Sequence, residues 1–232
     1  MRTQSLCFLV STLVIILRVG YSGKVFDYYI FAVTWPPTFC DAKKLPLPKV
    51  LNNFTIHGLW PKILLDKDPH CKPKEQFNIT KIQDLLKDLE RLWPSLKDYS
   101  KPESFWKHEF SKHGMCVHED PKIKNQHGYF EFGLNLMKRF NILEFLKKHG
   151  IIPHVSQQYE TRKLQDIFES EFRHNVSLYC TDKKGQKGVQ RLEEIWMCLD
   201  PDHQPINCPP ISKCSTNFTF PPFPHLPCNT LK

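Results

Sequence analysis

The segment VFDYYIFAVTW, residues 25–35, consists mostly of β-branched and aromatic side chains and is followed by Pro36 and Pro37. Such a run predicts a buried strand, which the two prolines end. Working outward, apolar periodicity and turn residues predict short strands at 54–57, 176–180 and 189–199 and helices at 79–93, 129–149 and 161–172. An exposed loop is predicted at 63–77, and an irregular stretch held by disulfides at 200–228. This order of elements predicts one α+β domain with a central, mostly antiparallel sheet and packed helices.

The first residues have the three parts of a secretory signal peptide. Arg2 supplies a positive start, residues 6–17 form an apolar core, and GYS at 20–22 is a small-x-small cleavage pattern. The apolar run is too short for a comfortable membrane span, and no later segment approaches that length. We therefore expect a signal peptide at 1–22 and a secreted, extracellular single domain at 23–232, with no membrane anchor.

The chain is basic, with 32 Lys and Arg against 24 Asp and Glu and a formal net charge of +8. Loss of Arg2 and Arg18 with the signal lowers this excess but leaves it positive. A basic secreted protein favours polyanionic partners such as nucleic acid, pectin or an anionic glycan, although the same charge also serves plain solubility. Charge alone does not separate these alternatives.

Cysteine usage supports export. Nine cysteines are present, and Cys7 would leave with the signal, so an even number remains and implies disulfides. No C-x-x-C pair occurs, which argues against a zinc knuckle. The chain also has sequons at Asn53, Asn78, Asn175 and Asn217, which together suggest an N-glycosylated protein.

The segment FWKHEFSKHGMC, residues 105–116, holds two histidines, a glutamate and two lysines. Ser100 and Glu103 are spaced as a capping box, with Pro102 in the first turn, so a helix is predicted to begin there and to end at Gly114. From this segment alone, the helix could be catalytic, could bind a metal ion, or could present only the charged face of a surface helix.

Four side chains of this helix lie within an arc of about 140° at about 100° per residue. They are His108, Glu109, Lys112 and His113. The zinc alternative fits poorly, because the zincin motif H-E-x-x-H places its histidines four residues apart on one face, whereas the step here is five. We therefore expect no metal ion and no other cofactor.

A second segment, TIHGLWP at 55–61, places His57 in a predicted strand. Gly58 and Pro61 predict a turn that holds Trp60 beside His57, where its ring offers a stacking face for a nucleic-acid base. Imidazoles titrate near neutrality, so two of them can serve as general base and general acid at the same pH. RNA carries its own nucleophile, the 2′-hydroxyl, so the reaction needs no metal, and a fixed ammonium can stabilise the phosphoryl charge.

The two segments together resemble the active-site segments of the ribonuclease T2 family, which usually read H-G-L-W-P and F-W-x-H-E-W-x-K-H-G-T-C. Here they read IHGLWP at 56–61 and FWKHEFSKHGMC at 105–116. The start FDYYIFAVTWPPTFC and the phrase NNFTIHGLWP resemble the plant S-ribonucleases, the stylar glycoproteins of gametophytic self-incompatibility. The resemblance implies a secreted, metal-independent endoribonuclease that cleaves single-stranded RNA through a 2′,3′-cyclic phosphate, on a disulfide-stapled α+β fold.

The resemblance also implies roles for individual residues. His57 would be the general acid and His113 the general base. Glu109 and Lys112 would stabilise the phosphorane-like transition state, and His108 would contact the phosphate.

The expected substrate-binding residues are mostly aromatic. They are Trp60, which in the family also orients the first histidine, and Phe105, Trp106 and His108. The chain departs from the usual motif at Phe110 and Met115, neither of which is a proton carrier. Thr34 stands where many members have a glutamine that touches RNA, so we do not expect Thr34 to bind RNA.

The resemblance implies the disulfides Cys71–Cys116, Cys180–Cys214 and Cys198–Cys208. The remaining two, Cys40 and Cys228, are predicted to bond to each other, because the usual partner shortly after Cys40 is missing.

The expected partners are RNA and N-linked glycans, and the resemblance to S-ribonucleases adds pollen F-box proteins. We expect a monomer, with any allele recognition in the loop at 63–77, although that stretch could equally be an ordinary solvent loop. The alternatives are an S-like ribonuclease of defence or phosphate scavenging, and a catalytically inactive binding protein on the same fold. The second is less favoured because His57, His108 and His113 are all present.

Overall fold

The computed structural model describes residues 25–64, 67–72, 74–183 and 186–224. The expected signal peptide at 1–22 and Cys228 lie outside these residues. Within the described ranges, no helix combines the length and the apolar character that a membrane crossing requires.

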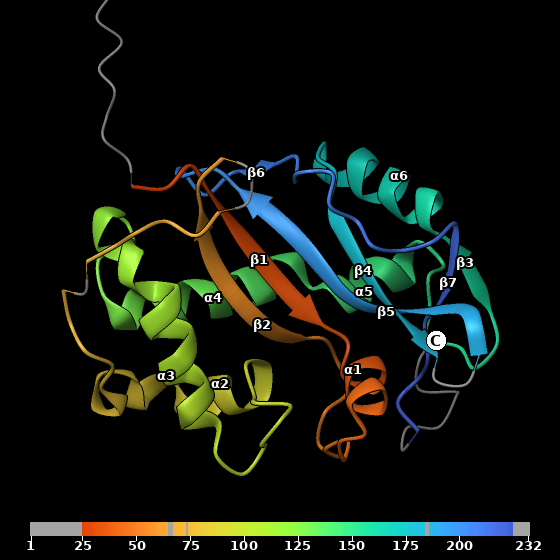
Figure 1. Cartoon of the computed structure of the whole chain (residues 1–232), viewed down its shortest axis with the longest axis horizontal. Helices are drawn as coiled ribbons and strands as arrows, with labels where there is room; N and C mark the ends of the chain where they lie inside the picture. Colours follow the sequence, from red (N-terminus) through yellow and green to blue (C-terminus); the bar gives the residue numbers. More distant parts are fainter. Residues whose placement is uncertain (1–24, 65–66, 73, 184–185, 225–232) are drawn as a thin grey trace, which may run out of the picture.

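The segment at 25–35 forms an interior strand of the sheet. Strand β1 (Tyr28–Thr34) pairs antiparallel with β2 (Thr55–Lys62) on one side and with β5 (Gln186–Leu199) on the other. Every residue of β1 is buried, as its β-branched and aromatic composition predicts, and the strand lies across the middle of the molecule (Figure 1). The positions of β2 and β5 therefore follow from β1.

The rest of the sheet is built around β5. The strand order is β2-β1-β5-β7-β3, with β4 and β6 also pairing with β5. The additional strands are β3 (Gln158–Glu160), β4 (Ser177–Lys183), β6 (Pro205–Ile206) and β7 (Asn217–Thr219). Only the contact of β5 with β7 is parallel among these pairs. The prediction of an α+β fold with a mostly antiparallel sheet is confirmed.

The helices gather at the two ends of the sheet and behind it. Figure 1 shows α2 and α3 beside β2, α4 and α5 behind the sheet, and α6 at the opposite end. Their bounds are α1 (Pro36–Lys43), α2 (Leu86–Leu92), α3 (Pro102–Lys112), α4 (Gln126–Phe140), α5 (Ile142–Lys148) and α6 (Thr161–Phe172), with the 3-10 helices η1 (Ile79–Leu85) and η2 (Gly114–Glu119).

Two predicted helices are each divided in two. The helix predicted at 129–149 is α4 followed by α5, because Asn141 takes a left-handed conformation with φ 37° and ends α4. The helix predicted at 79–93 begins as η1 and becomes α-helical only at Leu86. Helix α6, by contrast, has the predicted bounds. Pro36 and Pro37 end β1 as expected, but they also begin α1, because proline has no N–H to lose in a first turn.

The strand that carries His57 is longer than predicted. β2 does not end at Gly58 but continues through Pro61 to Lys62. Proline is tolerated there because β2 is an edge strand, where the missing N–H costs no ladder hydrogen bond. The predicted turn at Gly58 and Pro61 is therefore wrong, and Trp60 reaches the neighbourhood of His57 along the strand.

The capping box predicted before α3 is also wrong. Lys101, not Ser100, occupies the N-cap position, and no side chain caps the helix. Ser100 instead donates through Oγ to Oδ1 of Asp98 at 2.7 Å. Pro102 is the first helical residue, so its fixed φ, together with packing, begins the helix.

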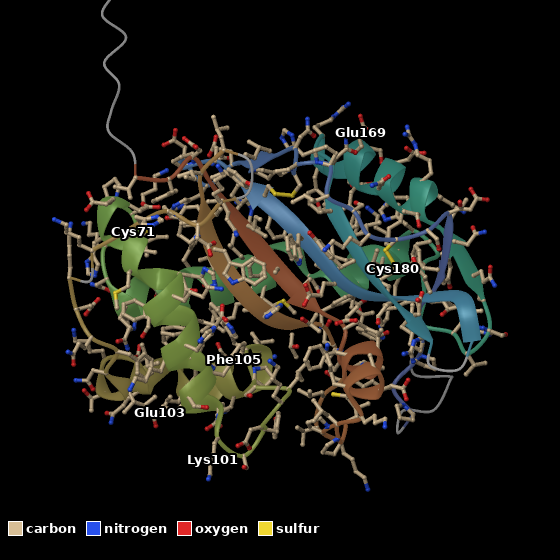
Figure 2. The ribbon with its side chains drawn as sticks, viewed as in Figure 1. Cys71, Lys101, Glu103, Phe105, Glu169 and Cys180 are labelled. Carbon is tan, nitrogen blue, oxygen red and sulfur yellow. A yellow bond between two sulfur atoms is a disulfide. The ribbon has the colours of Figure 1, made fainter. Side chains whose placement is uncertain are left out.

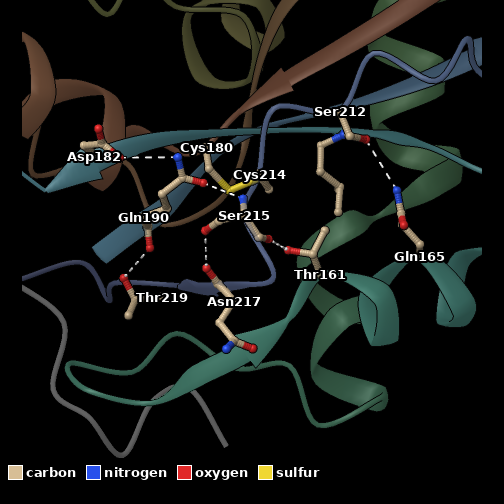
Figure 3. The surroundings of a disulfide bond; sticks show 11 residues. Thr161, Gln165, Cys180, Asp182, Gln190, Ser212, Cys214, Ser215, Asn217 and Thr219 are labelled. Carbon is tan, nitrogen blue, oxygen red and sulfur yellow. Dashed lines mark hydrogen bonds between the residues drawn. A yellow bond between two sulfur atoms is a disulfide. The ribbon is translucent and has the colours of Figure 1, made fainter. Parts of the chain in front are cut away.

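Three disulfides tie loops to these elements, and they are the pairs implied by the resemblance: Cys71–Cys116, Cys180–Cys214 and Cys198–Cys208. Figure 3 shows how Cys180–Cys214 anchors the stretch before β7, where Gln190 accepts from the backbone N–H of Ser215 at 2.6 Å and Thr161 donates to the carbonyl of Ser215 at 2.5 Å. Cys40 is a buried free thiol among the described residues, and its pairing with Cys228 stays a prediction.

Candidate active site

The side chain of His57 projects from β2 and pairs with one carboxylate. Nδ1 of His57 donates to Oε1 of Glu194 at 2.7 Å, and the imidazole side chain keeps 38% of its surface exposed. Its ring lies edge-on to Trp60, with centroids 5.0 Å apart, and stacks on Phe105 at 6.4 Å. The imidazole therefore contacts Glu194, Trp60 and Phe105 and remains partly exposed.

The charges around His57 favour its protonated form. Burial opposes the charge of the imidazolium, but the hydrogen bond to Glu194 and the negative charges of Glu194 and Glu109 outweigh it and raise the pKa of His57. Burial likewise opposes the charge of Glu194, but the hydrogen bond and charge of His57 hold the pKa of Glu194 below its ordinary value. The two groups therefore stabilise each other as an ion pair.

His113 has the opposite environment. It follows the last residue of α3, is 7% exposed, and its ring lies 5.5 Å from the centroid of Trp60. Burial, reinforced by the charge of Lys112, lowers the pKa of His113 to about 3, and the nearby Asp68 only partly offsets this. His113 is therefore a neutral imidazole at the pH where His57 is charged.

Trp60 joins the two histidines to Glu109. Its Nε1 donates to Oε2 of Glu109 at 2.9 Å, across the contact between β2 and α3. A Cβ at Gly58 would collide with Nε1 of Trp60 and with Oε2 of Glu109. Gly58 is therefore the point of close approach that lets the strand and the helix meet. Burial raises the pKa of Glu109, although this hydrogen bond and the neighbouring cations act in the opposite direction.

A cleft of about 560 Å³ opens beside His57. Phe105, His108 and Glu109 of α3 line it, together with Glu194 on the strand side. Figure 2 places Phe105 beside α3, near the beginning of β2, in agreement with its contact with His57. His108 and Lys112 are both exposed on α3, and of these two His108 lines the cleft.

Two of the expected RNA contacts are corrected by the burial of the side chains. Trp106 is 2% exposed, packs in the hydrophobic core, and donates through Nε1 to the carbonyl of Trp93 at 2.7 Å. It cannot offer a surface to RNA. Trp60 is 8% exposed and enclosed by His57, His113 and Trp196. The indole contacts both imidazoles, and the predicted open stacking face is not present.

Sequence reasoning missed Glu194 and the spatial role of Gly58. Glu194 lies in LEEIWMC, an unremarkable strand pattern, and only the pairing of β5 with β1 brings it to His57. Thr34, which was not expected to bind RNA, also lines the cleft and donates through Oγ1 to Oε1 of Glu194 at 3.1 Å. The one sequence signal for this part of the site was the departure from the family pattern at Thr34.

The remaining predicted positions lie apart from this cleft. Asn78 and Asn217 are exposed, whereas Asn53 and Asn175 are partly buried. In the described part of the loop at 63–77, Asp68 forms an ion pair with Lys62 at 2.8 Å. Within the described ranges, no three or more His, Cys, Asp or Glu side chains are grouped so that they could hold a metal ion.

The family assignment comes from matches that cover most of the chain. The sequence profile of the ribonuclease T2 family matches residues 26–208. Ribonuclease S-7 of Nicotiana alata is 34% identical over 194 residues, which cover 82% of this chain and 84% of that protein. Ribonuclease 1 of Arabidopsis thaliana is also 34% identical, over 94% of this chain and 97% of its own length.

Solved structures agree with this assignment. Ribonuclease MC1 from bitter gourd seeds superposes with a TM-score of 0.74 at 29% identity, over 84% of this chain and all of that one. Variants of that enzyme have been solved in complex with 5′-GMP and 5′-UMP. This chain belongs to the ribonuclease T2 family and is an endoribonuclease.

Proposed function

We propose that this endoribonuclease cleaves single-stranded RNA without a metal ion, by attack of the 2′-hydroxyl on the adjacent phosphodiester. His113 takes the proton of the 2′-hydroxyl, the bond from O2′ to phosphorus forms, and the bond from phosphorus to O5′ breaks. His57 gives its proton to the departing 5′-oxygen. The products are a 2′,3′-cyclic phosphate and a 5′-hydroxyl, with both protons accounted for.

The opposite environments of His57 and His113 around one indole ring carry this proposal. A general acid has to be protonated before the reaction, and the pair with Glu194 favours that state for His57. A general base has to be neutral, and burial beside Lys112 favours that state for His113. A bound phosphodiester adds negative charge near His113, which raises its pKa from about 3 and makes it a more effective base.

The groups on α3 are suited to the charge that develops on the phosphoryl oxygens. The ammonium of Lys112 and the imidazole of His108 lie on the exposed side of the helix. Glu109 is held in place by Trp60, and burial favours its protonated form, in which it can donate a hydrogen bond to an anionic oxygen. Fixed donors of this kind stabilise a transition state without reorganising.

Cleavage of an oligoribonucleotide in the presence of a strong chelator tests the mechanism. Wild-type protein should cleave RNA and not DNA, accumulate the 2′,3′-cyclic phosphate, and lose no activity with the chelator. His113→Ala should lose activity by about 10²–10⁴-fold. Chelator-sensitive cleavage would support a metal enzyme, and absence of cleavage by folded wild-type protein would support a binding protein on the same fold.

For the biological setting, we propose a secreted stylar S-ribonuclease. The support is the similarity to S-ribonucleases of Nicotiana alata, the basic charge and the exposed sequons at Asn78 and Asn217. The relatives also include both an extracellular and an intracellular ribonuclease of Solanum lycopersicum, so a general S-like ribonuclease is the alternative.

Two measurements separate these settings. Mass spectrometry of the protein from its native tissue should find the chain beginning near Gly23 with glycan on at least one sequon. In a self-incompatible plant, the protein should be present in styles, bind pollen F-box proteins, and be needed to reject self pollen. Expression throughout the plant, with unchanged pollen rejection in its absence, would favour the S-like ribonuclease.

A further inference from the structure

Glu194 is a buried carboxylate in the cleft that takes no part in the chemical steps above. It is 8% exposed and receives three hydrogen bonds. Oε1 accepts from Nδ1 of His57 at 2.7 Å and from Oγ1 of Thr34 at 3.1 Å, and Oε2 accepts from Nε1 of Trp196 at 2.7 Å. A carboxylate held by three donors has one orientation.

The sheet explains how Glu194 reaches His57. Thr34 of β1 is directly opposite Glu194 of β5, and Thr34 is also opposite Thr55 of β2. The carboxylate therefore reaches from β5 across the end of β1 to His57 on the edge strand β2. Trp196 is itself fixed, since its ring stacks on Tyr179 with centroids 4.0 Å apart and meets Trp60 edge-on at 5.1 Å.

We propose that Glu194 is a positioning residue for His57, and this rests on the role of His57 as general acid. By accepting a hydrogen bond from Nδ1–H, Glu194 leaves Nε2 as the nitrogen that faces the departing 5′-oxygen. When Nε2 gives up its proton, the neutral imidazole keeps the Nδ1 proton and its bond to Glu194. Nε2 is then free to accept a proton from water when the cyclic phosphate is hydrolysed.

The other charges that face His57 do not replace this contact. Glu109 of α3 also favours the imidazolium, whereas Lys97 opposes it. Glu193 lines the same cleft from the neighbouring position on β5. Burial raises the pKa of Glu193, and the charge of His57 acts in the opposite direction. Of these acidic groups, Glu194 is the one within hydrogen-bond distance of an imidazole nitrogen, so it alone can select the tautomer.

A purely structural role for Glu194 makes a different prediction from a positioning role. If the carboxylate only satisfied its donors, its loss would lower stability without moving the pH at which His57 titrates. A positioning residue also sets the charge of its histidine, so its loss moves the alkaline limb of the pH profile. Glu194→Gln keeps the shape of the side chain and removes the charge, and Glu193→Gln is the matched control on the same strand.

The experiment measures kcat/KM against pH on a dinucleoside phosphate for wild type and both variants. For Glu194→Gln, the limb where activity falls with rising pH should move to lower pH by about one unit. This corresponds to about a tenfold loss at alkaline pH and a much smaller loss at acidic pH. Glu193→Gln should shift the limb less. Equal shifts in both variants, or no shift in a folded Glu194→Gln protein, would overturn the proposal.

NMR titration of the His57 imidazole gives a readout that does not depend on activity. In wild type, His57 should titrate above its usual value of 6.5 with a proton on Nδ1, and in Glu194→Gln it should titrate lower. If the protein did not cleave RNA, the proposed function would fail while this coupling could still be seen. If Glu194→Gln did not fold, a wild-type His57 that titrates at or below its usual value would still overturn the inference.

Discussion

His57 and His113 contact the same indole ring from two different elements, yet their surroundings differ in almost every respect. His57 lies on an edge strand, keeps 38% of its side chain exposed and pairs with a carboxylate. His113 follows the end of α3, is buried, and has Lys112 as its neighbour. One pKa is raised and the other lowered.

The comparison shows that the surroundings of two identical side chains favour opposite charge states. In the sequence, either histidine could be the acid or the base, and only the family resemblance distinguished them. In the structure, the ion pair with Glu194 favours a protonated His57 and the burial beside Lys112 favours a neutral His113, which supports the proposed assignment.

The largest difference should appear when the leaving group no longer needs a proton. On a dinucleoside phosphate, His57→Ala and His113→Ala should each lose about 10²–10⁴-fold in kcat/KM. On a nucleoside 3′-nitrophenyl phosphodiester, whose leaving group departs as an anion, His57→Ala should recover to within about tenfold of wild type. His113→Ala should stay impaired on both substrates, because the nucleophile still has to lose its proton.

His127→Ala is the control, since His127 lies on α4 and pairs with Asp84 away from the cleft. It should behave as wild type on both substrates. Recovery of His113→Ala rather than His57→Ala on the activated substrate would reverse the assignment of acid and base.

Two disulfides offer a second way to perturb His113 separately from His57, because Cys71–Cys116 adjoins His113 and Cys180–Cys214 does not. Cys116 lies in η2 directly after α3, whereas Cys180–Cys214 lies at the other end of the sheet (Figure 2). The bonded residues are 45 and 34 positions apart, respectively, so the chain-entropy model gives nearly equal stabilisation for both. Replacing either pair by alanine should lower the free energy of unfolding by about 2–5 kcal/mol.

The effect on catalysis should differ between the two pairs. At a temperature where both variants remain folded, loss of Cys71–Cys116 should lower kcat, because the end of α3 is freed, and loss of Cys180–Cys214 should leave kcat near wild type. Urea unfolding measures the first quantity and RNA cleavage the second. Equal losses of kcat in the two variants would show that the Cys71–Cys116 disulfide does not act through the position of His113.

Gly58→Ala should disturb both histidines at once by displacing the ring between them. The added Cβ would collide with Trp60 and Glu109, and overpacking of this kind costs about 1–3 kcal/mol. Gly150→Ala is the matched control: its φ is +74° but nothing lies near its Cβ, so it should cost about 1 kcal/mol from backbone strain alone. Thermal unfolding should show a loss for both variants, while RNA cleavage should fall only for Gly58→Ala; intact cleavage in that variant would show that Trp60 tolerates displacement.

Parts of the structure could be predicted from the sequence where the pattern lies within one segment of the chain, and not where it depends on contacts between segments. Strand β1 and helix α6 were predicted because their apolar patterns are continuous within one segment. The break at Asn141 was not, because a left-handed asparagine inside a helical pattern leaves the periodicity intact. Gly58 and Pro61 look like turn residues, and only the position of β2 at the edge of the sheet makes them strand residues.

The site divides in the same way. Helical spacing placed His108 and Glu109 near each other, and both line the cleft, whereas Lys112 and His113 are not among its lining residues. Trp106 was misassigned because spacing does not say which face of the helix meets the core. Glu194 was missed because it lies 137 positions from its partner His57, and a contact at that distance depends on the register of three strands.

A further difference is one of sign, in how the two histidines link stability to pH. Unfolded His113 takes up a proton near 6.5, whereas folded His113 stays neutral down to about 3, so the unfolded state binds more protons between these values. Stability should therefore fall as pH falls through this window, by at most about 1.4 kcal/mol per pH unit from this group. His113→Gln should remove that contribution and gain relative stability at acidic pH.

His57 should show the opposite behaviour. Because its folded pKa is raised, its pair with Glu194 stabilises the protein fully below 6.5, and that contribution is lost as pH rises through the folded value. His57→Gln should therefore lose more stability at about pH 5 than at about pH 8.5, while His113→Gln should show the reverse. Urea unfolding at the two pH values measures both differences, and the same sign in both variants would mean that the two environments are not opposed.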